Sequence, residues 1–193
     1  MAVNLQKGQK ISLEKEAGGA LSKVAMGLGW DVKQAPAGLF GKKKEKTIDL
    51  DASCVVFDAN GALVDTVWFG QLKSKDGSIS HSGDNLTGAG DGDDETITVD
   101  LTRVSPNVKS LVFTVSSFTG QTFAEVERAF CRIVNSGNGR EIARYDLSAQ
   151  GAYTAQILAK LYRHGSEWKM AAIGETGNGR TFEALLPLIK PHL

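Results

Sequence analysis

Six acidic side chains lie close together in a glycine-rich segment, residues 76–95, that contains no lysine or arginine. Its five glycines permit backbone conformations with positive φ, so the segment can fold carboxylates and carbonyl oxygens towards one point. Carboxylates about 5 Å apart repel each other by roughly 0.8 kcal/mol per pair in bulk water and by about 3 kcal/mol at an effective dielectric constant of 20. A hard divalent cation among these groups would replace the repulsion by attraction.

Calcium fits these donors best, because it accepts about six to eight oxygen ligands in a flexible geometry. Magnesium fits less well, since it keeps several waters and usually shares its site with a phosphate. Zinc is disfavoured because the chain has three histidines and no paired-cysteine or paired-histidine spacing. The segment also lacks the EF-hand pattern. A solvated, flexible loop is the simpler alternative to a calcium site.

Three further acids precede this segment in the chain. Asp49 and Asp51 are two residues apart, so they lie on one face of the strand that we expect there, and Asp31 follows Gly29-Trp30. We expect tertiary structure to bring these carboxylates to the acidic segment. For Asp49 and Asp51 an exposed strand face is an equally good interpretation.

Two kinds of enzyme are alternatives to a binding module. His81 lies among Ser78, Ser80 and Ser82, but a Gly-x-Ser-x-Gly nucleophile elbow is absent. A metal-dependent phosphoester hydrolase uses the same carboxylates and a divalent ion, so it stays open as an alternative. We predict a protein that is not an enzyme.

A basic stretch at residues 34–46 is predicted to be a flexible loop, because it has no hydrophobic periodicity. It does not match a phosphate-binding loop, which would need glycine at Pro36 and serine or threonine at Lys43. Lys42 to Lys46 could instead assist calcium-dependent attachment to an anionic membrane surface, which is a further alternative.

The composition indicates a single soluble domain over residues 1–193. Basic and acidic side chains number 22 each, so the overall charge gives no reason to expect nucleic acid as a partner. Cys54 and Cys131 each lie in an apolar stretch, where a free thiol packs as a small hydrophobe, and this favours a reducing cytoplasm. No apolar run is long enough for a signal peptide or a membrane span.

Apolar residues at every second position predict strands around residues 11–13, 24–28, 48–56, 97–101, 111–115 and 157–161. Hairpin turns are predicted at Asn60-Gly61, at residues 136–139 and at His164-Gly165, with sequential antiparallel pairing. Helical spacing predicts two short helices, after Thr122 and after Thr181. Many strands and few helices favour a mostly β fold, an antiparallel β-sandwich with short helical additions.

Several motifs, taken in order, resemble the TerD family of tellurium-resistance proteins over nearly the whole chain, and more closely its TerZ-like branch. They are Gly27–Asp31, Asp49–Ser53, Lys75–Ile79, Gly83–Gly88, Gly90–Glu95, Glu141–Tyr145 and Leu161–His164. The segment Ser116–Phe123 and the basic insertion near Lys42 are similar to the TerZ-like branch. Ala89 departs from the family pattern, in which an acidic residue is frequent here.

The resemblance implies a cytoplasmic β-sandwich that binds two calcium ions and acts in resistance to tellurite and other stresses. It implies sister Ter proteins and a membrane-bound Ter partner as associates, within a multi-protein complex. The calcium ligands that it implies are Asp31, Asp49, Asp51, Asp76, Asp84, Asn85, Asp91, Asp93, Asp94 and Glu95.

Overall fold

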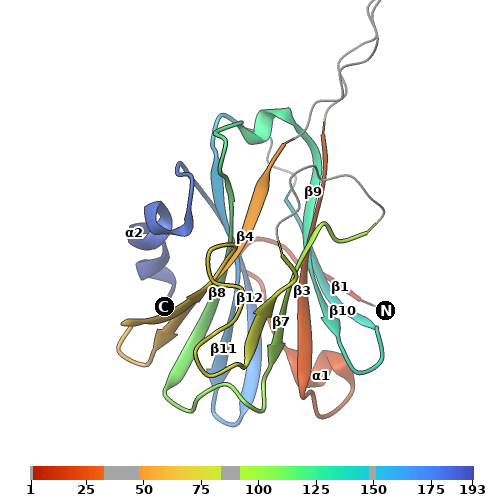
Figure 1. Ribbon diagram of the computed structural model, residues 1–193. Helices are drawn as coiled ribbons and strands as arrows, with labels where there is room; N and C mark the ends of the chain where they lie inside the picture. Colours follow the sequence, from red (N-terminus) through yellow and green to blue (C-terminus); the bar gives the residue numbers. More distant parts are fainter. Residues whose placement is uncertain (1, 33–47, 84–91, 148–150) are drawn as a thin grey trace, which may run out of the picture.

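Two six-stranded sheets pack face to face as a sandwich in the computed structural model of this protein (Figure 1). The structure describes residues 2–32, 48–83, 92–147 and 151–193. In spatial order, sheet A contains β1 (Val3–Asn4), β10 (Glu141–Asp146), β9 (Val126–Asn135), β3 (Lys23–Val32), β7 (Glu95–Asp100) and β6 (Ile79–His81). Sheet B contains β2 (Lys10–Ser12), β12 (Glu167–Gly177), β11 (Ala155–His164), β8 (Val108–Ser117), β4 (Leu50–Asp58) and β5 (Leu63–Val67). The predicted mostly β sandwich is confirmed.

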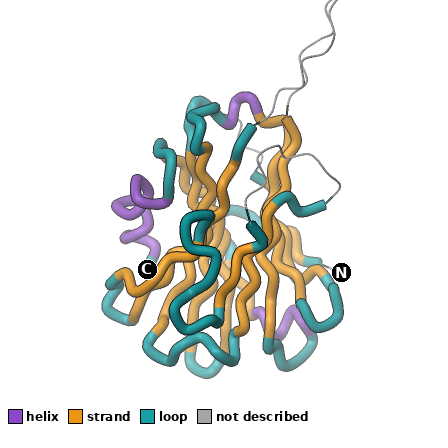
Figure 2. The backbone as a smooth tube through the Cα atoms, in the orientation of Figure 1, coloured by secondary structure: helices purple, strands orange, loops and turns teal. Residues whose placement is uncertain are grey.

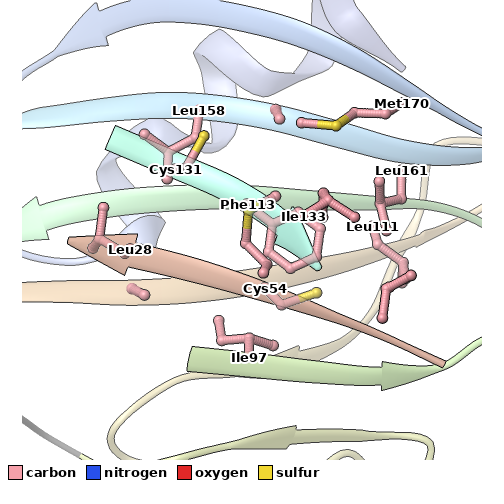
Figure 3. Packing of buried hydrophobic residues seen from close by; sticks show 14 of the residues in the cluster. Leu28, Cys54, Ile97, Leu111, Phe113, Cys131, Ile133, Leu158, Leu161 and Met170 are labelled. Carbon is pink, nitrogen blue, oxygen red and sulfur yellow. The ribbon is translucent and has the colours of Figure 1, made fainter. Parts of the chain in front are cut away.

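The space between the sheets is filled by the apolar side chains that alternate along the strands (Figure 3). Leu111, Phe113 and Leu161 are among the residues buried there. Cys54 and Cys131 lie in the same core as free thiols. Burial raises the pKa of both thiols, that of Cys131 to about 12, so both pack as neutral hydrophobic groups.

A second, smaller core covers the outer face of sheet B. It forms where the C-terminal segment, η2 (Phe182–Leu185), α2 (Leu186–Ile189) and η3 (Lys190–His192), packs on the strands (Figure 1). Leu185 and Ile189 are fully buried in this core. Pro187 lies in the first turn of α2, where a missing N–H costs no helical hydrogen bond. The short helix predicted after Thr181 is therefore confirmed.

Helix is otherwise confined to α1 (Leu13–Ala17) and a single turn, η1 (Phe123–Glu125), in the part of the chain drawn in colour in Figure 2. The helix predicted after Thr122 is wrong, because the chain continues from η1 directly into β9. Strand β9 lies between β10 and β3, and pairing on both sides outweighs a local helical spacing. In the described residues, no helix is long and apolar enough to cross a membrane.

The three predicted hairpins join β4 to β5, β9 to β10 and β11 to β12. In each turn one glycine, Gly61, Gly139 or Gly165, has a positive φ. Strictly sequential pairing is wrong, because β3 lies between β9 and β7, β4 pairs with β8, and β1 runs parallel to β10. The basic stretch 34–46 lies outside the described residues, and β6 forms within the acidic segment 76–95.

The two sheets are tied to each other at the start of β4. Strand β5 pairs with β4 only from Cys54 to Phe57, so Ala52 lies beyond the end of that ladder. The Ala52 N–H donates to Glu95 Oε2 over 2.7 Å, and the Ala52 carbonyl lies 3.2 Å from His81 Nε2. Glu95 belongs to β7 and His81 to β6, so two side chains of sheet A replace a strand beside sheet B.

We expect Glu95→Leu to lower the free energy of unfolding by about 1–3 kcal/mol, because the Ala52 N–H then lacks its acceptor in a buried position. Glu95→Gln is the matched control, since its side-chain carbonyl can still accept from Ala52, and the loss should be smaller. Urea unfolding followed by circular dichroism in the presence of a chelator measures both. An unchanged midpoint in Glu95→Leu would show that the tie contributes nothing.

Candidate metal centre

Asp94 lies at the head of β7 and is held by the main chain of β3. Its carboxylate Oδ2 accepts from the Trp30 N–H over 2.8 Å, and its own N–H donates to the Leu28 carbonyl over 2.8 Å. Burial raises the pKa of Asp94 most, and the charges of Asp31, Asp93 and Glu95 raise it further, against the lowering effect of the Trp30 hydrogen bond. Three other predicted ligands therefore lie close enough to Asp94 to disfavour its charged form.

Two glycines in β3 let this acidic turn lie directly on the sheet. A Cβ atom at Gly27 would overlap the carboxylate of Asp93, and a Cβ atom at Gly29 would come within 2.7 Å of the Gly92 carbonyl oxygen. Both glycines are two residues apart and so lie on one face of the strand. The Gly27–Asp31 motif therefore provides a shallow backbone surface on which residues 92–94 rest.

Arginines from β9 neutralise part of the acidic charge. The Arg132 guanidinium donates to both Asp93 oxygens, over 2.7 and 3.2 Å, and to Glu141 over 3.1 Å. Arg128 forms an ion pair with Asp31 over 2.7 Å at a more exposed position. In the β3–β9 register Arg132 lies opposite Gly27 and Arg128 opposite Asp31. The acidic segment contains no counter-charge of its own, but tertiary structure supplies one from a strand distant in sequence.

Glu95 is buried and takes part in the tie between the sheets. Its Oε2 lies 3.4 Å from His81 Nε2, and neither side chain is exposed to solvent. The other ring nitrogen of His81, Nδ1, accepts from the Gly83 N–H over 3.0 Å. Because both ring nitrogens are engaged and the ring is buried, His81 is not placed to act as a general base for the neighbouring serines.

The tie also brings the start of β4 to the head of β7. Asp51 is the residue before Ala52, and it lies opposite Ser116 in the β4–β8 ladder. Side chains alternate along a strand, so Asp51 points to the outer face of sheet B while Ala52 points to the core between the sheets. Asp49 precedes β4, which begins at Leu50. The hydrogen bond between Ala52 and Glu95 thus brings the main chain of Asp51 close to Glu95, but the Asp51 side chain lies on the opposite face of β4.

Asp76 lies apart from the other predicted ligands that the structure describes. The Asp100 N–H donates to the Ser78 carbonyl, so Asp76 is near the far end of β7, about 17 Å along the strand from Glu95. Partial burial raises the pKa of Asp76, but hydrogen bonds from Ser78, Ser74 and the Ser105 N–H lower it to about 2. This carboxylate closes the turn before β6.

The structure brings Asp31, Asp93 and Glu95 close to Asp94, whereas Asp49 and Asp51 lie at or just before the start of β4, where the Asp51 side chain points to the outer face of sheet B. Asp84, Asn85 and Asp91 lie outside the described residues. Within residues 2–32, 48–83, 92–147 and 151–193, no three His, Cys, Asp or Glu side chains form a group that could hold a metal ion. The donors that do meet are carboxylate oxygens, which suit calcium or magnesium better than zinc.

A family model described as the TerD domain matches residues 1–187 of the chain. The chain is 49% identical over 184 residues to tellurium resistance protein TerZ of Serratia marcescens, covering 94% of this chain and 93% of that protein. It is 42% identical over 197 residues to stress response protein SCP2 of Bacillus subtilis (strain 168), covering 96% of this chain and 98% of that protein. Tellurium resistance protein TerD of Serratia marcescens is 39% identical over 183 residues, covering 91% of each chain.

A crystal structure of a homologue of the telluride resistance protein TerD from Streptomyces coelicolor A3(2) shares the fold. Its TM-score is 0.67 at 23% sequence identity, covering 83% of this chain and 92% of that one. Of these two Serratia marcescens proteins, TerZ is more similar to the chain than TerD is, as the residues of the TerZ-like branch predict. The matched model and these relatives extend over nearly the whole chain, and the chain therefore belongs to the TerD family of tellurium resistance and stress response proteins.

Proposed function

We propose that the chain is a calcium-binding module of the tellurite-resistance and stress-response system. The observation that carries this proposal is the environment of Asp94, whose carboxylate is partly buried beside those of Asp31, Asp93 and Glu95. The arginines of β9 pair with Asp31 and Asp93, and the Asp94 carboxylate accepts from the Trp30 N–H. A divalent cation beside Asp94 would relieve the remaining repulsion.

Calcium supplies positive charge and a flexible set of oxygen coordination positions when it is bound. Asp94 and Glu95 would hold the ion together with the acids that meet them. Asp49 and Asp51 are included in the proposed set from the start of β4, although the side chain of Asp51 points to the outer face of sheet B. Asp84, Asn85 and Asp91 complete the proposed ligand set for two ions. Asp76 is the least suited of the ten, because it lies far along β7 and already accepts four hydrogen bonds.

The chain's relatives carry names of resistance and stress proteins and are not named as enzymes. This supports a binding role rather than catalysis. We place the protein in the cytoplasm, consistent with two free, buried thiols. Its proposed partners are sister Ter proteins and a membrane-bound Ter partner, in a complex for which this domain provides a docking surface.

A partly exposed aromatic cluster near the start of β4 supports the docking role. Phe118 follows β8, next to the residues that pair with the start of β4, and its side chain is 44% exposed. Its ring lies edge-on to Phe69 at 5.4 Å, and Phe69 lies 4.4 Å from Trp68. Exposed aromatic side chains in a cluster are typical of protein interaction sites.

Calcium should raise the melting temperature of the chelator-treated protein. A ligand that binds only the folded state stabilises it by about 2.7 kcal/mol at a concentration 100 times its Kd, which corresponds to roughly 5–10 °C for a domain of this size. Differential scanning calorimetry measures the shift, and titration calorimetry gives the number of ions. An unchanged melting temperature in millimolar calcium would contradict the proposal.

Asp94→Asn should have opposite effects with and without calcium. The folded pKa of Asp94 is raised, so the folded state binds this proton more tightly than the unfolded state, and stability falls as pH rises through the folded pKa. The variant should therefore stabilise the metal-free protein at neutral pH, by up to about 1 kcal/mol after solvent screening, and flatten this pH dependence. It should also reduce the calcium-induced shift.

Asp100→Asn is the matched control, because it removes the same charge from the other end of β7. The pKa of Asp100 is lowered, chiefly by the Thr102 side chain, so this variant should not stabilise the metal-free protein and should leave the calcium-induced shift intact. If both variants lost the calcium response equally, the effect would come from net charge rather than from a site at Asp94.

Phe118→Ala should weaken association with purified sister Ter proteins at least ten-fold, because buried aromatic anchors dominate interface energies. Leu63→Ala, which removes a side chain with similar exposure of 46%, is the control. Surface plasmon resonance in calcium measures both. Equal affinities for the two variants would place the docking surface elsewhere.

A further inference from the structure

A pocket of about 160 Å³ opens between the edge strands of the two sheets, away from the acidic turn at the head of β7. β5 is the edge of sheet B and β6 is the edge of sheet A. The floor of the pocket is apolar, with side chains of Val56, Ile79, Val104 and Val108 from the main core. A cavity of about 150 Å³ in a protein core can hold benzene, so this pocket has room for about six heavy atoms.

Two carboxylates stand at the rim of the pocket and are held in place by neutral donors. Asp65 Oδ1 accepts from the Thr66 N–H and from Gln71 Nε2, each over 2.9 Å, and its Oδ2 accepts from the Lys75 N–H over 2.8 Å. Asp76 Oδ1 accepts from Ser74 and Ser78, and its Oδ2 accepts from the Ser105 N–H over 3.3 Å.

Each carboxylate therefore keeps an oxygen with a single donor. Neither Asp65 nor Asp76 has an ion-pair partner within 4.0 Å among the described residues. Because an ionised carboxylate oxygen can accept more than one hydrogen bond, both carboxylates can accept from a further donor. The lining includes one cation, Lys75, against these two anions. The nearby Arg103 guanidinium donates to the Asp76 main-chain carbonyl and not to the carboxylate, so both carboxylates can attract a positive ligand.

We propose that this pocket binds a primary alkylammonium group with an aliphatic chain of four or five carbons. The aliphatic chain of the ligand would lie on the valine and isoleucine floor. Its ammonium group would donate to Asp65 and Asp76, whose carboxylates are already oriented by hydrogen bonds within the turn. Such a group is the end of a lysine side chain of a partner polypeptide or a free small amine. The pocket shares Asp76 with the proposed calcium ligands, but Asp76 is the least suited of those and lies about 17 Å along β7 from Glu95, so either proposal can fail without the other.

The test is a titration of the full chain, ¹⁵N-labelled and in the presence of a calcium chelator, with pentylammonium chloride. Saturable shifts should appear at the amides of Thr66, Lys75, Ser78 and Ser105, with a Kd on the order of 1 mM for a ligand of this size. The alcohol 1-pentanol has the same chain without the charge, and it should bind at least ten-fold more weakly. Absence of saturable shifts, or equal affinity for 1-pentanol, would overturn the proposal.

Two variants test the pocket without touching the carboxylates. Val64→Phe places a larger side chain in the pocket and should weaken binding at least ten-fold, whereas Leu63→Phe, on the exposed neighbour, should not. Lys75→Ala keeps the main-chain N–H, removes the competing cation and should tighten binding by about three- to five-fold. Unchanged affinity in both Val64→Phe and Lys75→Ala would show that the ligand binds elsewhere.

N-acetyl-lysine methylamide distinguishes the two sources of the amine. Affinity equal to or higher than that of pentylammonium supports the lysine side chain of a partner, because the pocket then accepts the flanking peptide groups. Affinity at least ten-fold lower supports a free small amine.

Discussion

The main-chain N–H and carbonyl of Ala52 lie where β4 continues past the end of β5, and both need a partner in a buried place. Glu95 and His81 satisfy them from the opposite sheet. This requirement fixes how the two sheets meet at one edge, and it places the start of β4 beside the head of β7. The acidic residues of the candidate site depend on it, because Asp94 directly precedes Glu95 and Asp51 directly precedes Ala52.

The charge balance of the site follows from the order of strands in sheet A. β3 has β9 on one side and β7 on the other, so the acidic turn that leads into β7 crosses the glycines of β3 and reaches the arginines of β9. Arg132 and Arg128 pair with Asp93 and Asp31, and the proposed cation would act chiefly on Asp94 and its neighbours. The arginine side chains and an exchangeable bound cation would then both stabilise the same turn.

Alternating apolar residues predicted strands at β2, β3, β4, β7, β8 and β11, and turn glycines predicted three hairpins, because both signals are local. The prediction of a helix after Thr122 is wrong because β9 pairs with strands on both sides. The spacing of apolar residues within this segment cannot reveal that pairing. The acids of residues 93–95 stand out in sequence, but their pairing with Arg132 depends on a register between distant strands. Asp76 belongs to the same acidic segment in sequence, but strand β6 lies between it and Glu95, so the two carboxylates are far apart in the structure.

The edges of both sheets are short. β1, β6, β2 and β5 have two, three, three and five residues, whereas the central strands β8, β9, β11 and β12 have ten or eleven. A long, flat edge strand offers unpaired backbone groups to another chain and promotes aggregation. Each of these long strands has a neighbouring strand on both sides for part of its length, as β12 has β2 beside it at Lys169–Ala171. The short edge strands themselves offer few backbone groups to which another chain could pair.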